Sequence, residues 1–160
     1  MMPRSTTMPM HACRTRKLMA IALFGTLAIG CVAVPPPLQG AWSPLSPHEV
    51  DATSIGSAVR WGGRVVAVES EGARTCFRLI AQPLGRNGQP DGSDTSLGHF
   101  SACRAGSYDT RTFAPNREVT VTGRIEGFDA AEGPSNRASN AAPPVPRVAA
   151  QAIVLWPRRR

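Results

Sequence analysis

The stretch from Glu118 to Glu126 constrains the fold of this chain more than any other, because its residues alternate strictly between two kinds. Val119, Val121 and Ile125 fall on one side of an extended chain, while polar and charged residues fall on the other. A period of two residues is typical of a β-strand in a sheet that buries one face and exposes the other to water. Such sheets are commonly antiparallel, so we expect an antiparallel sheet with a strand here.

Four other segments have the composition of strands, and residues typical of turns and loops separate them, including a loop predicted at 128–146. The four are residues 59–68, 75–81, 97–103 and 148–156. The first contains Gly62 and Gly63, and glycine inside a strand marks the bulge or bend that a small barrel needs. The last is apolar on both faces, which is typical of a central strand or of one that closes a barrel. Helical character is limited to one turn within 48–56, so we predict an all-β fold: a small antiparallel barrel of five to six strands, OB-like.

The chain opens with the pattern of an export signal. A basic cluster at 14–17 precedes an apolar run of about 12 residues at 18–29. This run is shorter than the roughly 20 residues that cross a bilayer, and it lacks the polar face of an amphipathic core helix. We therefore interpret residues 1–30 as a signal peptide.

The end of this signal resembles the bacterial lipobox, in which a small residue precedes a cysteine. Gly30 and Cys31 occupy those positions, so we predict cleavage between them and acylation of Cys31. Two or more acyl chains anchor a protein stably without a spanning helix. Val32 is not the aspartate that retains lipoproteins at the inner membrane in enteric-type sorting, which favours the outer membrane. The alternative is an ordinary signal that releases a soluble protein.

The proline-rich segment that follows, residues 31–47, is predicted to be a semi-rigid, disordered tether, because proline favours extended geometry and blocks helix. The barrel domain is then predicted at 48–157 and a basic tail at 158–160. We interpret the tail as a frayed, solvated terminus, with contact to anionic lipid as the alternative.

Two cysteines remain in the domain, Cys76 and Cys103. Pairing the strands at 75–81 and 97–103 would bring them together, and an oxidising compartment favours a disulfide. Free buried thiols and a metal site are the alternatives. The metal interpretation is weak, because no second cysteine lies near either one and the histidines are scattered. We predict the disulfide and no metal.

The charge of the chain argues against a nucleic-acid partner. The formal net charge is +7, but four of the 18 basic residues lie in the signal and all 11 acidic residues follow it. The remaining net charge of +3 equals that of the tail Arg158–Arg160. A neutral domain lacks the basic surface by which proteins bind nucleic acid, so we predict none.

Several segments resemble the Slp family of starvation-inducible outer-membrane lipoproteins. Val59–Val66 resembles the opening strand of that family. Further matches follow in the family's order: Gln82-Pro83-Leu84, Gly98-His99-Phe100, Glu118–Gly123 and Ala152–Pro157. The resemblance covers roughly residues 50–157. It implies an outer-membrane lipoprotein whose function is not enzymatic, and it supplies no catalytic residues.

Side chains that carry out chemistry are few in the predicted domain. His48 and His99 are the histidines after the signal, and we interpret His99 as structural. No serine-hydrolase, zinc-protease or phosphate-loop motif is present, and we interpret Glu69 and Glu71 as a solvated pair on a turn. We therefore predict no enzyme, no catalytic residue and no cofactor.

These inferences predict an outer-membrane lipoprotein that holds a non-catalytic β domain in the periplasm for envelope maintenance or stress response. Its partners would be membrane lipid, through acylated Cys31, and an unknown envelope protein. The alternative is a periplasmic binding module for a small ligand, a glycan or an envelope protein. A filled barrel would favour the first function, and an apolar concavity with a few polar groups would favour the second.

Overall fold

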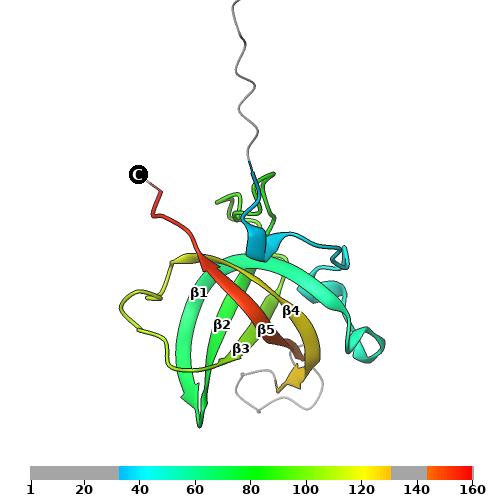
Figure 1. The fold of residues 1–160 in the computed structure, drawn as a ribbon. Coiled ribbons are helices and arrows are strands. Elements are labelled where there is room, and N and C mark those ends of the chain that lie inside the picture. Colours follow the sequence, from blue (N-terminus) through cyan, green and yellow to red (C-terminus); the bar gives the residue numbers. More distant parts are fainter. Residues whose placement is uncertain (1–32, 131–143, 160) are drawn as a thin grey trace, which may run out of the picture. The chain divides into compact units, whose positions relative to one another are not determined.

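The structure, a computed structural model, describes residues 33–130 and 144–159 (Figure 1). The predicted signal, Cys31 and most of the predicted loop 128–146 lie outside the described residues. The elements in chain order are η1 (Pro36–Leu38), η2 (Pro47–Glu49), η3 (Ala52–Ser54), β1 (Ala58–Glu71), β2 (Arg74–Gln82), β3 (His99–Ala105), β4 (Glu118–Asp129) and β5 (Val145–Leu155). The predicted helical turn within 48–56 takes the form of two 3₁₀ turns, η2 and η3.

The five strands form a closed barrel in the order β1-β2-β3-β5-β4, with β4 paired back to β1. This confirms the predicted all-β, OB-like barrel, and β5 is the strand that closes it. One strand pair differs from the expected antiparallel arrangement, because β3 and β5 are parallel. Their pairing covers three residue pairs. The reason is geometric: a closed ring with an odd number of strands cannot have every neighbouring pair antiparallel.

Apolar side chains from every strand fill the barrel. The interior includes Phe77 and Leu79 of β2, Phe100 of β3, and Val148 of β5, each at most 1% exposed. The Trp61 ring packs edge-on against Phe100, with ring centroids 5.3 Å apart. Burying a side chain of this size contributes about 1.5–3 kcal/mol, so this core is the main stabilising feature of the domain.

The outer face of β4 is not exposed to water over its first half, which departs from the expected exposed face. Thr120 and Thr122 belong to that face, yet they are 0% and 1% exposed. The Thr122 hydroxyl donates to the Pro37 carbonyl at 3.2 Å, and the Thr120 hydroxyl donates to the Gly88 carbonyl at 2.7 Å. The Trp156 indole N–H in turn donates to the Thr120 hydroxyl at 2.9 Å. The N-terminal segment, the loop that contains Gly88 and the residue that follows β5 therefore cover this face of β4.

The N-terminal segment supplies part of this cover, so residues predicted to form a spacer pack against the barrel. Leu38 is 0% exposed, and its carbonyl accepts hydrogen bonds from Trp42 and Arg60 at 3.0 and 2.9 Å. The Ser43 N–H donates to the Ala58 carbonyl at 2.7 Å as part of a short parallel bridge to β1. Residues 36–47 thus belong to the folded domain rather than to a spacer.

Two glycines lie where neighbouring strands approach most closely. A Cβ added to Gly63 would lie 2.2 Å from the Ile80 carbonyl oxygen, and one added to Gly123 would lie 2.2 Å from the Ala149 carbonyl oxygen. Backbone atoms in a strand ladder cannot yield as a flexible side chain can. Glycine at these two positions is therefore a requirement of barrel closure.

We predict that Gly63→Ala lowers the free energy of unfolding by at least about 2 kcal/mol, because the new methyl group must displace the β2 backbone. Gly127→Ala is the matched control: it lies in β4, and a Cβ there would meet no atom within 4 Å. Urea denaturation of the two variants measures the difference. Equal stability of the two would contradict the steric argument.

Candidate functional site

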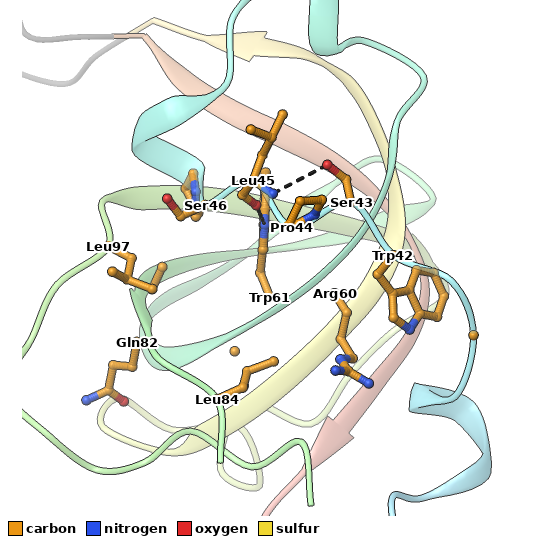
Figure 2. A pocket seen from close by; sticks show the side chains of 14 residues that line it. Trp42, Ser43, Pro44, Leu45, Ser46, Arg60, Trp61, Gln82, Leu84 and Leu97 are labelled. Carbon is orange, nitrogen blue, oxygen red and sulfur yellow. Dashed lines mark hydrogen bonds between the residues drawn. The ribbon is translucent and has the colours of Figure 1, made fainter. Parts of the chain in front are cut away.

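A cleft of about 340 Å³ lies between the N-terminal segment and the barrel, beside β1 and the end of β2. Figure 2 shows Trp42 and Arg60 on one side of it and Gln82 and Leu97 on the other. The remaining lining residues are Gly40, Ser43, Pro44, Leu45, Ser46, Pro47, Trp61, Gly62, Ala81 and Leu84. The surface of the cleft is therefore about as polar as it is apolar.

Gln82 is the most informative polar group of the cleft. It is 2% exposed, and its amide NH₂ donates to the Ser93 carbonyl. This bond fixes the orientation of the amide, and Oε1 is then buried with no hydrogen-bond partner among the described residues. An unpaired buried acceptor costs about 1–3 kcal/mol, so natural sequences rarely keep one without a use. Because Oε1 itself has almost no exposed surface, a donor in the cleft can reach it only after the Gln82 side chain moves.

The geometry of the cleft follows from the docking of the N-terminal segment. The Trp61 indole N–H donates to the Leu45 carbonyl at 2.7 Å, which holds the segment over β1. Ser46 and Glu49 cap η2: the Ser46 N–H donates to the Glu49 carboxylate at 2.8 Å. Hydrogen bonds from the Ser46 hydroxyl, and then from the Ser46 backbone N–H, lower the pKa of Glu49 below its ordinary value. The wall of the cleft is thus held by bonds that persist at neutral pH.

A second, larger hollow of about 780 Å³ lies over the outer face of β2 and β3. Several of its polar groups are bound to one another. Asp129 accepts hydrogen bonds from Ser101 and Arg147 at 2.5 and 2.6 Å, and Arg147 also lies 3.3 Å from Glu71. The hydrogen bond to Asp129 raises the pKa of the Arg147 guanidinium above its ordinary value. We interpret this cluster as a set of polar contacts that joins β3, β4 and β5. It lies beside the short parallel pairing of β3 with β5.

One of the predicted disulfide residues, Cys76, lines the second hollow. Cys76 and Cys103 are direct cross-strand partners, and the structure joins them by a disulfide. Together with Glu71 they form the only cluster of metal-ligating side chain types within residues 33–130 and 144–159. Because both sulfurs are bonded to each other, no thiolate remains there to bind a metal.

The other candidate residues are dispersed. His48 Nδ1 lies 2.9 Å from the Leu97 carbonyl, while His99 is exposed on β3. Glu69 and Glu71 are not simply solvated, since Glu69 lies 3.1 Å from Arg78 and Glu71 lies 3.9 Å from Arg74. The structure therefore does not assemble these side chains into a catalytic group.

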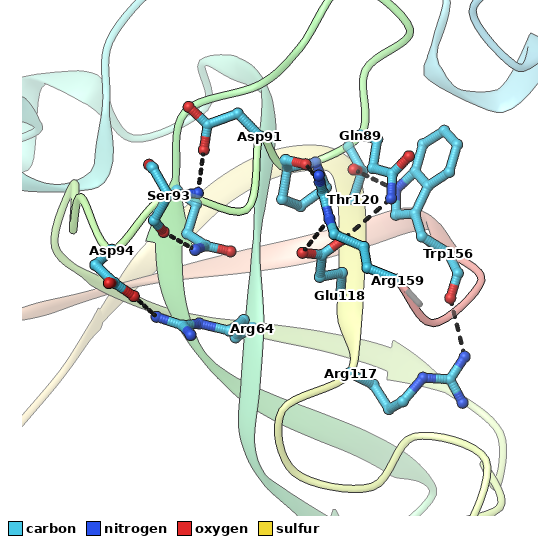
Figure 3. A network of polar contacts seen from close by, with 12 residues as sticks. Arg64, Gln89, Asp91, Ser93, Asp94, Arg117, Glu118, Thr120, Trp156 and Arg159 are labelled. Atoms are coloured by element: carbon cyan, nitrogen blue, oxygen red, sulfur yellow. Dashed lines mark hydrogen bonds and ion pairs between the residues drawn. The ribbon is translucent and has the colours of Figure 1, made fainter.

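Part of the basic tail is docked rather than frayed. The Arg159 guanidinium lies 3.0 Å from the Glu118 carboxylate and donates to the Pro90 carbonyl (Figure 3). Arg117 donates to the Trp156 carbonyl at 2.9 Å, which fixes the chain just before the tail. Arg160 lies outside the described residues. Sequence patterns missed both this docking and the Gln82 acceptor, because neither produces periodicity or a motif.

The barrel and the predicted lipoprotein signal can be compared with known proteins. Residues 28–160 match the Outer membrane lipoprotein Slp family. The chain belongs to this family. It is therefore a lipoprotein of the outer membrane, as predicted, and the family implies anchoring to the membrane by lipid. No helix within the described residues is long and apolar enough to cross a membrane.

A curated relative is the Uncharacterized lipoprotein YeaY of Escherichia coli (strain K12), which is 32% identical over 114 residues. The match covers 66% of this chain and 58% of the relative, so the chain matches little more than half of that protein's length. The name of this relative states no activity.

We predict that reduction of the Cys76–Cys103 disulfide lowers the free energy of unfolding by about 3–4 kcal/mol, given the sequence separation of 27 residues. Chemical denaturation with and without reductant measures the loss, and the double variant Cys76→Ala/Cys103→Ala serves as the control that reductant must leave unchanged. Two alkylatable thiols in the unreduced, purified protein would contradict the disulfide.

Proposed function

We propose that this protein is an outer-membrane lipoprotein that holds a non-catalytic barrel in the periplasm and serves envelope maintenance or stress response. The observation that carries the proposal is membership of the Slp family together with Gly30 and Cys31 at the end of the signal pattern. In this proposal residues 1–30 are removed, Cys31 is acylated, and residues 36–157 form the domain. Because the chain matches 58% of its curated relative, this activity is proposed for the chain itself.

The packing of the barrel supports a non-catalytic role. Its interior is filled by residues such as Phe77 and Phe100, which leaves no room for a substrate. The polar groups of the second hollow, Asp129 and Arg147 among them, pair with each other rather than with a nucleophile and base. An enzyme would need reactive groups that converge on one point in a cleft.

We predict that Cys31→Ser moves the protein from the outer-membrane fraction to the soluble periplasmic fraction, because the serine hydroxyl cannot accept the diacylglycerol. Cys13→Ser is the matched control and should leave fractionation unchanged, since Cys13 lies within the proposed signal. Metabolic labelling with a radioactive fatty acid reports acylation directly. A Cys31→Ser protein that has lost residues 1–30 and still stays membrane-bound would contradict the lipid anchor.

A second candidate function is ligand binding in the 340 Å³ cleft, and the buried acceptor of Gln82 is the observation that favours it. The half-exposed Trp42 ring offers a flat apolar surface on the opposite wall. An N-acetylated sugar has an apolar ring face and an amide N–H donor, so its chemistry suits both groups. We infer that a short envelope glycan is the class of ligand that this cleft fits best.

We predict that Gln82→Met weakens binding of a peptidoglycan-derived disaccharide about tenfold, the loss expected for one buried hydrogen bond. Gln151→Met is the control, because Gln151 is exposed and lies outside the cleft. Isothermal titration with purified disaccharide measures both variants, and thermal melting verifies that they fold. Absence of binding by the unsubstituted protein would remove this candidate function.

A further inference from the structure

The chain between the lipid site and the barrel is short. The first residue that the structure describes is Ala33, and Val34 already lies against the loop between β2 and β3: a Cβ on Gly88 would be 3.7 Å from Val34 Cγ1 and 3.3 Å from Leu38 Cδ1. Three residues along an extended chain span at most about 11 Å. An acylated Cys31 therefore lies within about 11 Å of Val34, however the intervening chain runs.

Val34 belongs to one end of the barrel. The same end carries the long loop 83–98, which contains Gly88, and the C-terminal residues after β5 (Figure 1). Arg159 joins the C-terminal residues to loop 83–98, because it donates to the Pro90 carbonyl and packs against Gly92. The opposite end carries the β1–β2 turn, at the other end of the nine-residue strand β2. About 27 Å separates the two ends of that strand.

The charges at the lipid-proximal end favour an anionic surface. Arg86 and Arg158 are exposed there. In residues 33–38, loop 83–98 and Arg158–Arg159 the acidic residues are Asp91 and Asp94, and Glu118 lies beside them; Glu118 is paired with Arg159 at 3.0 Å, and Asp94 lies 3.7 Å from Arg64. Arg86 and Arg158 set against Asp91 leave these segments with a positive balance of one charge. Basic residues held close to a membrane are attracted to anionic headgroups.

We propose that this end of the barrel, formed by residues 33–38, loop 83–98 and Arg158–Arg159, lies directly on the anionic headgroups of the leaflet that holds the lipid. The domain is thus held on the membrane surface instead of standing away from it. The inference rests on the proposed acylation of Cys31. It goes beyond that anchor because it fixes which face of the domain meets the lipid.

The test uses the full, acylated protein in vesicles of phosphatidylcholine with phosphatidylglycerol. Thr95→Cys places a fluorophore on loop 83–98, and Ser70→Cys places one near the β1–β2 turn; both side chains are exposed. A headgroup-attached quencher should reduce the fluorescence of the label at 95 at least about twofold more than that of the label at 70, given the distance between the ends. Equal or reversed quenching would overturn the proposal.

Charge variants test the lipid contact itself. Arg86→Gln should shift the ratio of docked to undocked protein about fivefold on the anionic vesicles, as measured by quenching at position 95. Arg104→Gln is the matched control, because Arg104 pairs with Thr75 at the far end of β2 and should leave the quenching unchanged. An unchanged signal in both variants would overturn the headgroup contact.

Vesicle flotation separates the two claims. Protein that does not float overturns the lipid anchor, and the docking with it. Protein that floats but shows equal quenching of both labels overturns the docking alone and leaves the proposed function intact.

Discussion

The burial of Leu38 against the barrel is the contact on which the rest of this structure depends. It holds the proline-rich segment over β4, and its carbonyl receives the Trp42 and Arg60 donors. Without that contact the outer face of β4 would be exposed to water, and the 340 Å³ cleft would lose the wall formed by the N-terminal segment. The unpacked segment would then form a longer link between Cys31 and the barrel. A single apolar side chain, 0% exposed, therefore links the barrel, the candidate site and the distance to the membrane.

The sequence predicted the barrel well because its evidence is local. The alternation from Glu118 to Glu126 is visible in nine consecutive residues, and β4 spans Glu118–Asp129. The pairing of Cys76 with Cys103 likewise follows from two adjacent strands joined by one loop. The parallel pairing of β3 with β5 was not predicted, since it results from the strand count of the closed ring and from no single segment.

The covered face of β4 shows where local patterns fail. Thr120 and Thr122 have the same character as the exposed residues of an ordinary sheet, so alternation alone assigns them to water. Threonine tolerates burial when its hydroxyl finds a partner, and here the partners are the carbonyls of Gly88 and Pro37. Within the N-terminal segment, η1 uses the Pro35 and Pro36 carbonyls as internal acceptors, while the Pro37 carbonyl accepts the Thr122 hydroxyl. Which surface supplies a donor to that carbonyl is a tertiary property.

The candidate cleft and the lipid-proximal end share the same part of the chain. Leu84 and Leu97 line the cleft, and both belong to loop 83–98, which forms that end. A barrel that rests on the leaflet by this loop keeps the cleft beside the membrane surface. Ligands that reach Gln82 would then come from the headgroup region or from glycan near the membrane, rather than from the open periplasm. If Cys31 is acylated as proposed, the short link to it would restrict both where the domain lies and which ligands can reach its cleft.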